Sequence, residues 1–425
     1  MKSEIVAQLM NIHQGKKVIK SGRELCRSAR TPEEIKAAGA YKRVMTGTIV
    51  LVLALVVGMF PLGVRGVSLE VAGKSALLMD AATGTVLYEK NAHEALPPAS
   101  VTKIMTMLLI MEAIDSGKIR WEDTVTASEA AAAKGGSQIY LKVGETMSVS
   151  DMVKSIAVSS ANDCACAMAE HIAGSEEAFV AQMNQRAAEL GMQDTHFVNC
   201  TGLDDGENAG QHRTSAHDIA LMSRQLLKDH PNIKKFTTIW MDTIRNGTFG
   251  LSNTNKLVRF YQGATGLKTG FTSGAGYCLS ASAQREGMEL IAVVMGADTS
   301  ASRNAACKQL LDYGFANYAL VQPELKDPEP VNVKLGKANT VSAVLGKSQG
   351  LLIDKAQKSS VAMELSIDSS VTAPVSQGQR LGTLTLKAGE QVLQEVPLVA
   401  EEAVERLTFG DLFRMVLKRA AMANV

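Results

Sequence analysis

The chain has 425 residues, of which 46% are hydrophobic and 20% charged, and its formal net charge is +1. This length exceeds the usual size of one domain and predicts two domains with additional terminal segments. The apolar content excludes a mainly disordered protein, and the near-neutral charge gives no support for nucleic acid as a partner. The six cysteines show no Cys-x-x-Cys spacing, so we expect buried free thiols and no structural metal.

Residues 1–66 combine a basic leader with an apolar segment. Lysines and arginines outnumber the glutamates up to Arg43, and no charged residue then occurs before Arg65. About 20 uncharged residues are enough to cross a bilayer, and the preceding basic residues favour an N-terminus on the inside. We interpret the segment either as a signal anchor or as a signal peptide with a weak cleavage site at residues 64–66. Both alternatives predict export, and a buried core helix fits poorly after a basic leader.

The next stretch begins with a predicted hairpin over residues 75–90, after which two prolines precede Ser100 and Lys103 at the head of an apolar run. Prolines are tolerated before a helix but not inside it, so the run predicts a helix that is buried on most sides. Residues three apart share a helix face, which places Lys103 beside the Ser100 hydroxyl in a dry site. Burial lowers the pKa of an amine, and a neutral lysine can activate a serine. An ordinary exposed helical turn explains the same Ser-x-x-Lys pattern when it is taken alone.

A second group of polar residues interrupts an apolar segment in a helix that we expect to be capped near Ser150. Ser160 and Asn162 occur where a packed core would use alanine or leucine. They are able to aim a hydroxyl and an amide into one cleft, but a capped turn between two helices explains the pattern better when it is taken alone. We interpret the histidines that follow as structural or surface groups, with a helix capped by Ser215 between them: His196, His212 and His217.

A third group contains Lys-Thr-Gly at Lys268, Thr269 and Gly270. It precedes two strand-like runs, residues 277–283 and 290–296, which predict a hairpin at the edge of a sheet. At such an edge, these residues offer an extended peptide a charge, a hydroxyl and close backbone approach.

The order Ser-x-x-Lys, Ser-x-Asn, Lys-Thr-Gly is far more specific than each motif alone. The groups are separated by about 60 and then about 105 residues, and a set of this kind occurs in penicillin-binding proteins and class A β-lactamases. From Ser75 to about Tyr318, the chain closely resembles the low-molecular-mass penicillin-binding proteins, the serine-type D-Ala-D-Ala carboxypeptidases of the peptidase S11 type. The agreement extends to residues 136–141, 266–272 and 310–315.

The resemblance implies an α/β (α+β) fold of the β-lactamase/transpeptidase type, with the site between an all-helical part and an antiparallel sheet. Ser100 would attack the D-Ala-D-Ala bond of a peptidoglycan stem peptide, and Lys103 would take its proton. Ser160 would relay a proton to the leaving D-alanine. Because β-lactams mimic D-Ala-D-Ala, they are expected to acylate Ser100, and the reaction needs no metal or organic cofactor.

The same resemblance implies substrate-binding roles for Asn162, Lys268, Thr269, Gly270, Phe271 and Arg303. Asn162 would hold the acyl chain. The side chains of Lys268, Thr269 and Arg303 would bind the substrate carboxylate. The backbone N–H groups of Ser100 and Phe271 would form the oxyanion hole.

The C-terminal part changes to strand-like alternation, which predicts a small all-β domain over residues 326–400 after a catalytic domain over residues 67–325. Residues 401–425 predict an amphipathic helix with Phe409, Leu412 and Phe413 on its apolar side and Arg414 and Lys418 as basic charges. Such a helix suits the interface of an anionic membrane, although packing against the β domain is the alternative. The protein is therefore expected at the outer face of the bacterial cytoplasmic membrane or in the cell wall.

Two other functions compete with the carboxypeptidase. A class A β-lactamase uses a glutamate, commonly within Glu-x-x-Leu-Asn, and no such motif occurs between Asn162 and Lys268. A silent, membrane-anchored wall-binding protein has no need to keep Ser100, Lys103 and Lys268. Endopeptidase or transpeptidase action would use the same residues, but no large polymerase domain is appended.

Overall fold

The computed structural model describes residues 69–204 and 208–422, with side chains up to residue 418 in the last helix. The predicted leader and apolar segment lie outside these residues. Within them, an antiparallel five-stranded sheet has the order β2-β1-β9-β8-β7. Its strands are β1 (Ser75–Asp80), β2 (Val86–Lys90), β7 (Ala264–Thr272), β8 (Gly276–Arg285) and β9 (Met288–Ala297).

The sequence predicted the two hairpins of this sheet correctly but placed its edge wrongly. β1 pairs with β2, and β8 pairs with β9 from Tyr277↔Ala297 to Arg285↔Met288. However, β8 and β9 are inner strands, and the edge strand on this side of the sheet is β7, which contains the Lys-Thr-Gly segment itself. Glycine and threonine gave this segment the composition of a loop, but pairing with β8 makes it a strand.

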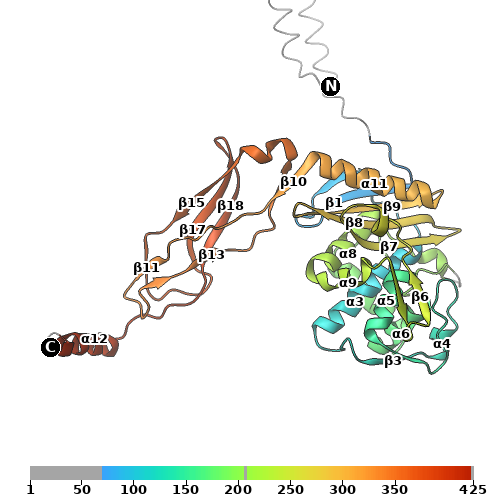
Figure 1. Cartoon of the computed structure of the whole chain (residues 1–425), viewed down its shortest axis with the longest axis horizontal. Coiled ribbons are helices and arrows are strands. Elements are labelled where there is room, and N and C mark those ends of the chain that lie inside the picture. The colour runs from blue at the N-terminus through green and yellow to red at the C-terminus, as the bar shows by residue number, and fades with distance from the viewer. Residues whose placement is uncertain (1–68, 205–207, 423–425) are drawn as a thin grey trace, which may run out of the picture. The chain divides into compact units, whose positions relative to one another are not determined.

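Helices cover both faces of the sheet. α11 (Ser300–Asn317) packs on β1, β8 and β9 and lies above the sheet in Figure 1, whereas α8 (Ala216–Asp229) packs on the same strands from below. Ser223 on α8 meets Ser280 on β8 through a buried hydroxyl pair at 2.8 Å. As predicted, the Ser215 side chain caps α8, accepting from Asp218 N.

A second part of this domain is helical and surrounds the almost entirely buried α3 (Lys103–Asp115). Ser148 caps α5 through a bond from Asp151 N, so the expected cap at Ser150 was two residues too late. The other helices are α4 (Glu129–Ala132), α5 (Val149–Ser159), α6 (Asn162–Ala173), α7 (Glu176–Glu189), α9 (Lys234–Thr237) and α10 (Leu257–Phe260). Short elements complete it: η1 (Ala99–Thr102), η2 (Ala209–Gln211), η3 (Pro231–Ile233), β3 (Thr124–Thr126), β4 (Thr146–Ser148), β5 (Met241–Ile244) and β6 (Phe249–Ser252).

The C-terminal residues form β strands around a hydrophobic core of their own, and the last helix follows them. This core includes Val331, Leu384 and Leu398. The strands are β10 (Tyr318–Val321), β11 (Val331–Lys334), β12 (Thr340–Val341), β13 (Ala343–Leu345), β14 (Leu351–Asp354), β15 (Val361–Ile367), β16 (Ser370–Thr372), β17 (Arg380–Ala388) and β18 (Gln391–Ala400). The helices are η4 (Lys355–Ser360) and α12 (Phe409–Met422).

Candidate active site

Ser100 and Lys103 lie together where η1 passes into α3. Lys103 Nζ is 2.9 Å from Ser100 Oγ and donates to Thr201 O at 2.8 Å. The lysine side chain is fully buried, whereas Ser100 is partly exposed. Burial lowers the pKa of Lys103 to about 7, because the charged form loses its water. A large share of Lys103 is therefore the neutral base at neutral pH, next to the hydroxyl that it would deprotonate.

The turn that presents Ser100 has an unusual backbone, which neighbouring polar groups hold in place. Ala99 adopts a φ of 50°, a left-handed conformation that costs a residue with a side chain about 1 kcal/mol or more. The Thr102 hydroxyl donates to Ala99 O at 2.8 Å and lies 2.8 Å from His212 Nε2. Because His212 Nδ1 accepts from Val198 N, its Nε2 carries the hydrogen that points at Thr102. Burial lowers the pKa of His212 to about 4, so this imidazole is a neutral structural group, as the sequence indicated.

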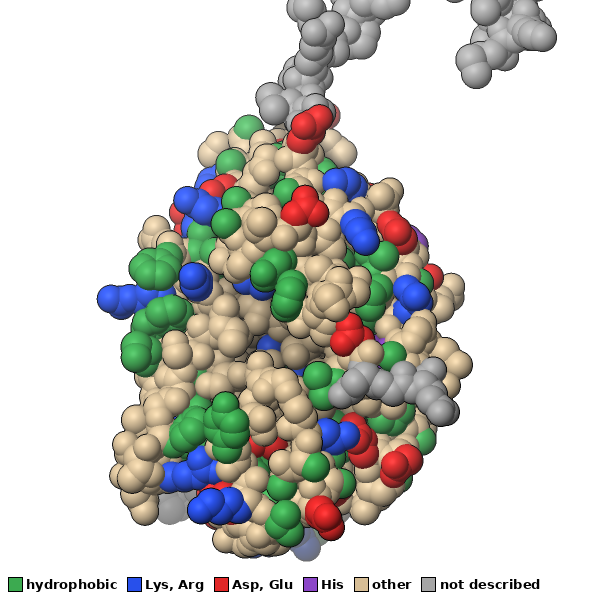
Figure 2. Space-filling view, turned by 90° about the vertical axis from the view of Figure 1, so that its right-hand side faces the viewer, with side chains coloured by type: hydrophobic (Ala, Val, Ile, Leu, Met, Phe, Trp, Pro, Cys, Tyr) green, Lys and Arg blue, Asp and Glu red, His purple; other side chains and the backbone are tan. Residues whose placement is uncertain are grey.

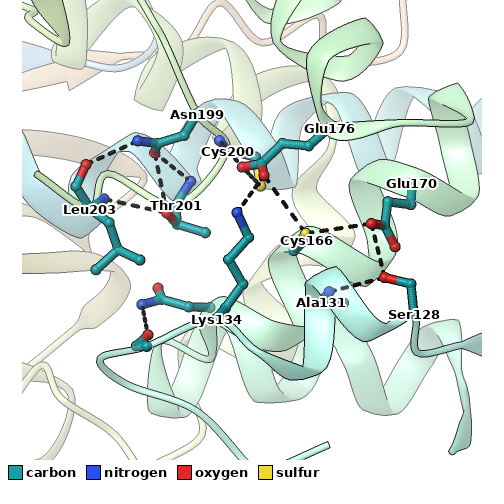
Figure 3. Close-up of polar contacts among 12 residues, drawn as sticks. Ser128, Ala131, Lys134, Cys166, Glu170, Glu176, Asn199, Cys200, Thr201 and Leu203 are labelled. Carbon is teal, nitrogen blue, oxygen red and sulfur yellow. Dashed lines mark hydrogen bonds and ion pairs between the residues drawn. The ribbon is translucent and has the colours of Figure 1, made fainter. Parts of the chain in front are cut away.

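The loop from Asn199 to Leu203 forms the wall beside Lys103. Asn199 Oδ1 accepts from Thr201 N at 3.1 Å and Gly202 N at 2.7 Å, and Asn199 Nδ2 donates to Leu203 O at 2.9 Å. Figure 3 shows the hydrogen bonds that the Asn199 side chain makes with Thr201 and Leu203. The loop thereby fixes Thr201 O, the acceptor of the Lys103 amine.

Gly202 is expected to tolerate no side chain. Its φ is +83°, and a Cβ there would lie 1.8 Å from Ala99 O. An alanine in the left-handed conformation costs about 1–2 kcal/mol by itself. Because of the added clash, Gly202→Ala should lower the free energy of unfolding by clearly more than this, and it should reduce acylation by penicillin. Urea unfolding and the labelled fraction measure the two effects.

Gly191→Ala is the matched control, because Gly191 has a φ of +74° but no atom within 4 Å of the added Cβ. This variant should show only the loss of stability that comes from an alanine in the left-handed backbone conformation. Equal losses in both variants would contradict the steric argument.

Ser160 and Asn162 lie at the turn between α5 and α6. Ser160 is buried and adopts a φ of 64°, which ends α5 and starts a new helix direction within two residues. Asn162 is held twice, because its backbone N donates to Ser137 O and its Nδ2 to Gly135 O, both at 2.7 Å. Among the residues described, no group bonds the buried Asn162 Oδ1, so this atom can accept from the amide of a bound peptide.

The Lys-Thr-Gly segment of β7 lies against the turn that carries Ser100. A Cβ on Gly270 would lie 2.6 Å from Pro98 O and 3.1 Å from Ser100 N, so only glycine allows this approach. The Thr269 hydroxyl donates to Thr254 Oγ1 at 2.7 Å, and Thr254 N donates to Val158 O near the end of α5. The sheet edge therefore contacts the helical part at two places, the turn that carries Ser100 and, through Thr254, the end of α5.

Three basic side chains are buried at the site. Within the described part of the chain, the buried lysines and arginines are Lys103, Lys268 and Arg303, all at most 4% exposed. Burial, together with the positive charges of Lys103 and Arg303, lowers the pKa of Lys268 well below its ordinary value. Figure 2 shows a hollow near the centre of one face, with lysine or arginine atoms at its base. An arrangement of this kind favours a ligand that brings a carboxylate.

Phe271 follows Gly270 but is 54% exposed. Its ring lies 4.3 Å from that of Tyr277, the partner residue on β8, and the Tyr277 ring also faces the guanidinium of Arg303 at 5.9 Å. Arg303 comes from the first turn of α11, and its Nη1 is 3.5 Å from Cys278 O. The structure thus connects Phe271 and Arg303 through Tyr277, although they are far apart in the sequence.

Comparison with known families identifies the chain. Residues 64–299 match the peptidase S11 model, described as D-alanyl-D-alanine carboxypeptidase. The chain belongs to the peptidase S11 family. Residues 323–406 also match the model of the C-terminal domain of penicillin-binding protein 5.

Other members of the S11 family match over most of their length. The D-alanyl-D-alanine carboxypeptidase DacF of Bacillus subtilis is 46% identical over 354 residues, which are 82% of this chain and 90% of the relative. The carboxypeptidase DacC of Escherichia coli is 35% identical over 364 residues, or 82% of this chain and 89% of the relative.

Solved structures of S11-like proteins share the fold. Penicillin-binding protein 5 of Haemophilus influenzae is 31% identical with a TM-score of 0.63, covering 79% of this chain and 98% of the other. Penicillin-binding protein D2 of Listeria monocytogenes, solved in an ampicillin-bound form, is 32% identical with a TM-score of 0.53, covering 58% and 98%. The expected transpeptidase-like fold with a C-terminal all-β domain is confirmed, and these relatives favour the carboxypeptidase over both competing functions.

The sequence did not predict several residues that shape the candidate site. Asp163 accepts from Ile139 N and Leu141 N and holds the loop beside Asn162, and Asn199 and Thr254 act as described above. Of these residues, only Asp163 could have been predicted from the sequence, since it directly follows the Ser-x-Asn motif at the start of a helix. Isolated polar residues in loops, such as Asn199 and Thr254, carry no periodicity that marks them.

Proposed function

We propose that this protein is a serine-type D-Ala-D-Ala carboxypeptidase that removes the terminal D-alanine from peptidoglycan stem peptides through an acyl-enzyme on Ser100. The observation that carries the mechanism is the 2.9 Å contact between Ser100 Oγ and the buried amine of Lys103. Few lysines are neutral near pH 7, and this one faces a partly exposed hydroxyl.

In the first step, Lys103 takes the hydroxyl proton while Ser100 Oγ bonds to the carbonyl carbon of the penultimate D-alanine. The C–N bond then breaks, and Ser160 relays the proton that Lys103 took up to the leaving amine, which returns Lys103 to its neutral form. Water attacks the resulting ester, which releases the shortened peptide and restores the hydroxyl. A β-lactam opens its ring in the same first step and remains bound to Ser100.

The backbone N–H groups of Ser100 and Phe271 would stabilise the oxyanion of each step. The close approach of Gly270 to Ser100 N supports this pairing, because it brings the β7 backbone to the nucleophile. Removing one such donor typically costs about 3 kcal/mol of transition-state stabilisation.

The substrate carboxylate would bind Lys268, Thr269 and Arg303. In the free protein, burial and mutual repulsion disfavour the positive charge on Lys268. A carboxylate relieves this repulsion and raises the pKa of Lys268, so binding takes up a proton. An uncharged C-terminal amide would gain none of this, so the proposal predicts a preference for peptides with a free C-terminus.

The test is the mass of the intact protein after brief exposure to a penicillin, together with D-alanine release from a peptide ending in D-Ala-D-Ala. A stable adduct with D-alanine release supports the carboxypeptidase. Rapid penicillin turnover without D-alanine release would indicate a β-lactamase instead. Neither adduct nor release would indicate a silent wall-binding protein.

We further propose that the enzyme works outside the cytoplasm, held at the membrane surface by α12. None of the helices in residues 69–204 and 208–422 is long and apolar enough to cross a bilayer. α12 instead exposes large apolar side chains, with Phe409 at 84%, Phe413 at 56% and Val416 at 65%, beside Arg414 and Lys418. The same proposal places domain borders near residues 66, 325 and 400. It also places an export segment before the first of these borders.

Phe413→Asp should weaken binding to vesicles that contain phosphatidylglycerol by about 10-fold or more, since burying such a ring is worth about 1.5–3 kcal/mol. Cosedimentation measures this. Met363→Asp, at an exposed apolar position of β15, should bind like the wild type. Equal binding of Phe413→Asp and the wild type would indicate that α12 serves another purpose.

A further inference from the structure

Glu176, the first residue of α7, joins two segments that approach the active site from different sides. Its Oε2 pairs with Lys134 Nζ at 2.5 Å, and its Oε1 accepts from Cys200 N at 3.1 Å and Cys200 Sγ at 3.2 Å. Figure 3 shows Glu176 between the lysine and the cysteine. We call Lys134, Glu176 and Cys200 the Glu176 bridge.

One end of the Glu176 bridge leads to Asn162. Lys134 is followed by Gly135, whose carbonyl accepts from Asn162 Nδ2 at 2.7 Å. The segment continues to Ser137, whose carbonyl accepts from Asn162 N at 2.7 Å. Fixing Lys134 therefore fixes the two carbonyls that orient Asn162.

The other end leads to Lys103. Cys200 is followed by Thr201, whose carbonyl accepts from Lys103 Nζ at 2.8 Å. Cys200 is held on both sides, by Glu176 at its N–H and by Thr106 Oγ1 at its carbonyl, the latter at 2.6 Å. A displaced Cys200 would move the carbonyl that holds the Lys103 amine.

We propose that Glu176 is a positioning residue for acylation, which holds Lys103 and Asn162 in register through Cys200 and Lys134. The proposal rests on the proposed function, because it assigns Lys103 and Asn162 their roles. The hydrogen bonds and ion pair of Glu176 in the bridge go to Cys200 and Lys134 and not to Ser100. Its carboxylate lies in the wall behind the site, beside a cavity of about 370 Å³ that is also lined by Lys134 and Thr201.

The charge on Glu176 is suited to this task. Burial raises the pKa of Glu176, but the ion pair with Lys134 and the Cys200 N–H lower it more, so the net shift is downward. The carboxylate thus stays ionised across the pH range in which Lys103 titrates. Charge-assisted hydrogen bonds are stronger and more directional than neutral ones, so an ionised Glu176 holds both segments better than an amide would.

The test compares Glu176→Gln, Lys134→Met and the double variant with the wild type. Glu176→Gln should slow acylation by penicillin and D-alanine release by about 10-fold to 100-fold, the usual effect of small misplacement of reacting groups. The acid limb of its pH profile should move to lower pH, because a displaced Thr201 carbonyl accepts less well from the protonated Lys103 amine. The double variant should be little slower than either single variant, since both break one bridge.

Glu177→Gln is the matched control. Glu177 is the next residue on α7, but it is exposed. This variant should acylate at the wild-type rate with an unchanged pH profile. If Glu176→Gln does not fold, Lys134→Met breaks the end of the bridge that leads to Asn162 and should also slow acylation.

A wild-type acylation rate in the bridge variants, or a wild-type pH profile in Glu176→Gln, would overturn the proposal whether or not the melting temperature falls. Strictly additive effects of the two substitutions would also overturn it. Failure of the proposed function looks different, because the wild type itself would then neither be labelled on Ser100 nor release D-alanine.

Discussion

Ser100→Ala is expected to abolish labelling by penicillin and to lower the rate of D-alanine release at least about 10³-fold. The variant removes the atom that would form the acyl bond, and loss of a nucleophile in serine enzymes has effects of this size or larger. Its fold should be retained, since Ser100 is partly exposed and Lys103 keeps its bond to Thr201 O. Intact-protein mass and a D-alanine assay provide the measurements.

Ser116→Ala is a suitable control for this experiment. Ser116 caps the far end of α3, where its hydroxyl donates to Ala113 O at 3.2 Å. This variant should be labelled and active like the wild type. A penicillin adduct on Ser100→Ala would show that another residue is the nucleophile.

The second large effect is expected at Lys103. Lys103→Met should slow acylation by about 10²–10⁴-fold, the usual contribution of a general base. In the wild type, burial lowers the pKa of Lys103 to about 7. The acylation rate should therefore rise with pH around that value, because the neutral amine is the active form. Lys103→Met should lose this rise, and a rate that falls as pH increases through 7 would contradict the assigned role.

The same pKa shift makes a prediction about stability that does not depend on activity. The pKa of Lys103 is about 7 in the folded protein and near its ordinary 10.5 when unfolded. Between these values the unfolded chain binds more protons, so the free energy of unfolding gains from Lys103 as pH rises. The free energy of unfolding measured in urea should thus increase for the wild type, relative to Lys103→Met, between pH 7 and pH 9.5. Parallel curves for the two proteins would argue against a neutral Lys103.

The buried basic side chains of the site reduce the stability of the free protein. Burying Lys103, Lys268 and Arg303 near one another disfavours the free protein. In the proposed mechanism, a substrate carboxylate would offset part of this cost, and the repulsion before binding would become selectivity for a free C-terminus.

Local sequence patterns determined the elements and the chemistry of this protein. The apolar run after the two prolines predicted the buried α3, and the three-residue spacing of Ser100 and Lys103 predicted their contact, because helix geometry alone brings such residues together. The order of the three motifs then indicated the family, which the comparisons confirmed.

The tertiary structure decided what depends on long-range pairing. The edge position of β7, the contact of Gly270 with the Ser100 turn and the link from Thr269 through Thr254 to α5 join segments that are distant in the chain. The Glu176 bridge is of the same kind, since it connects residues 134, 176 and 200. A single sequence records the residues at such positions but not which of them meet, because periodicity describes only neighbours within one element.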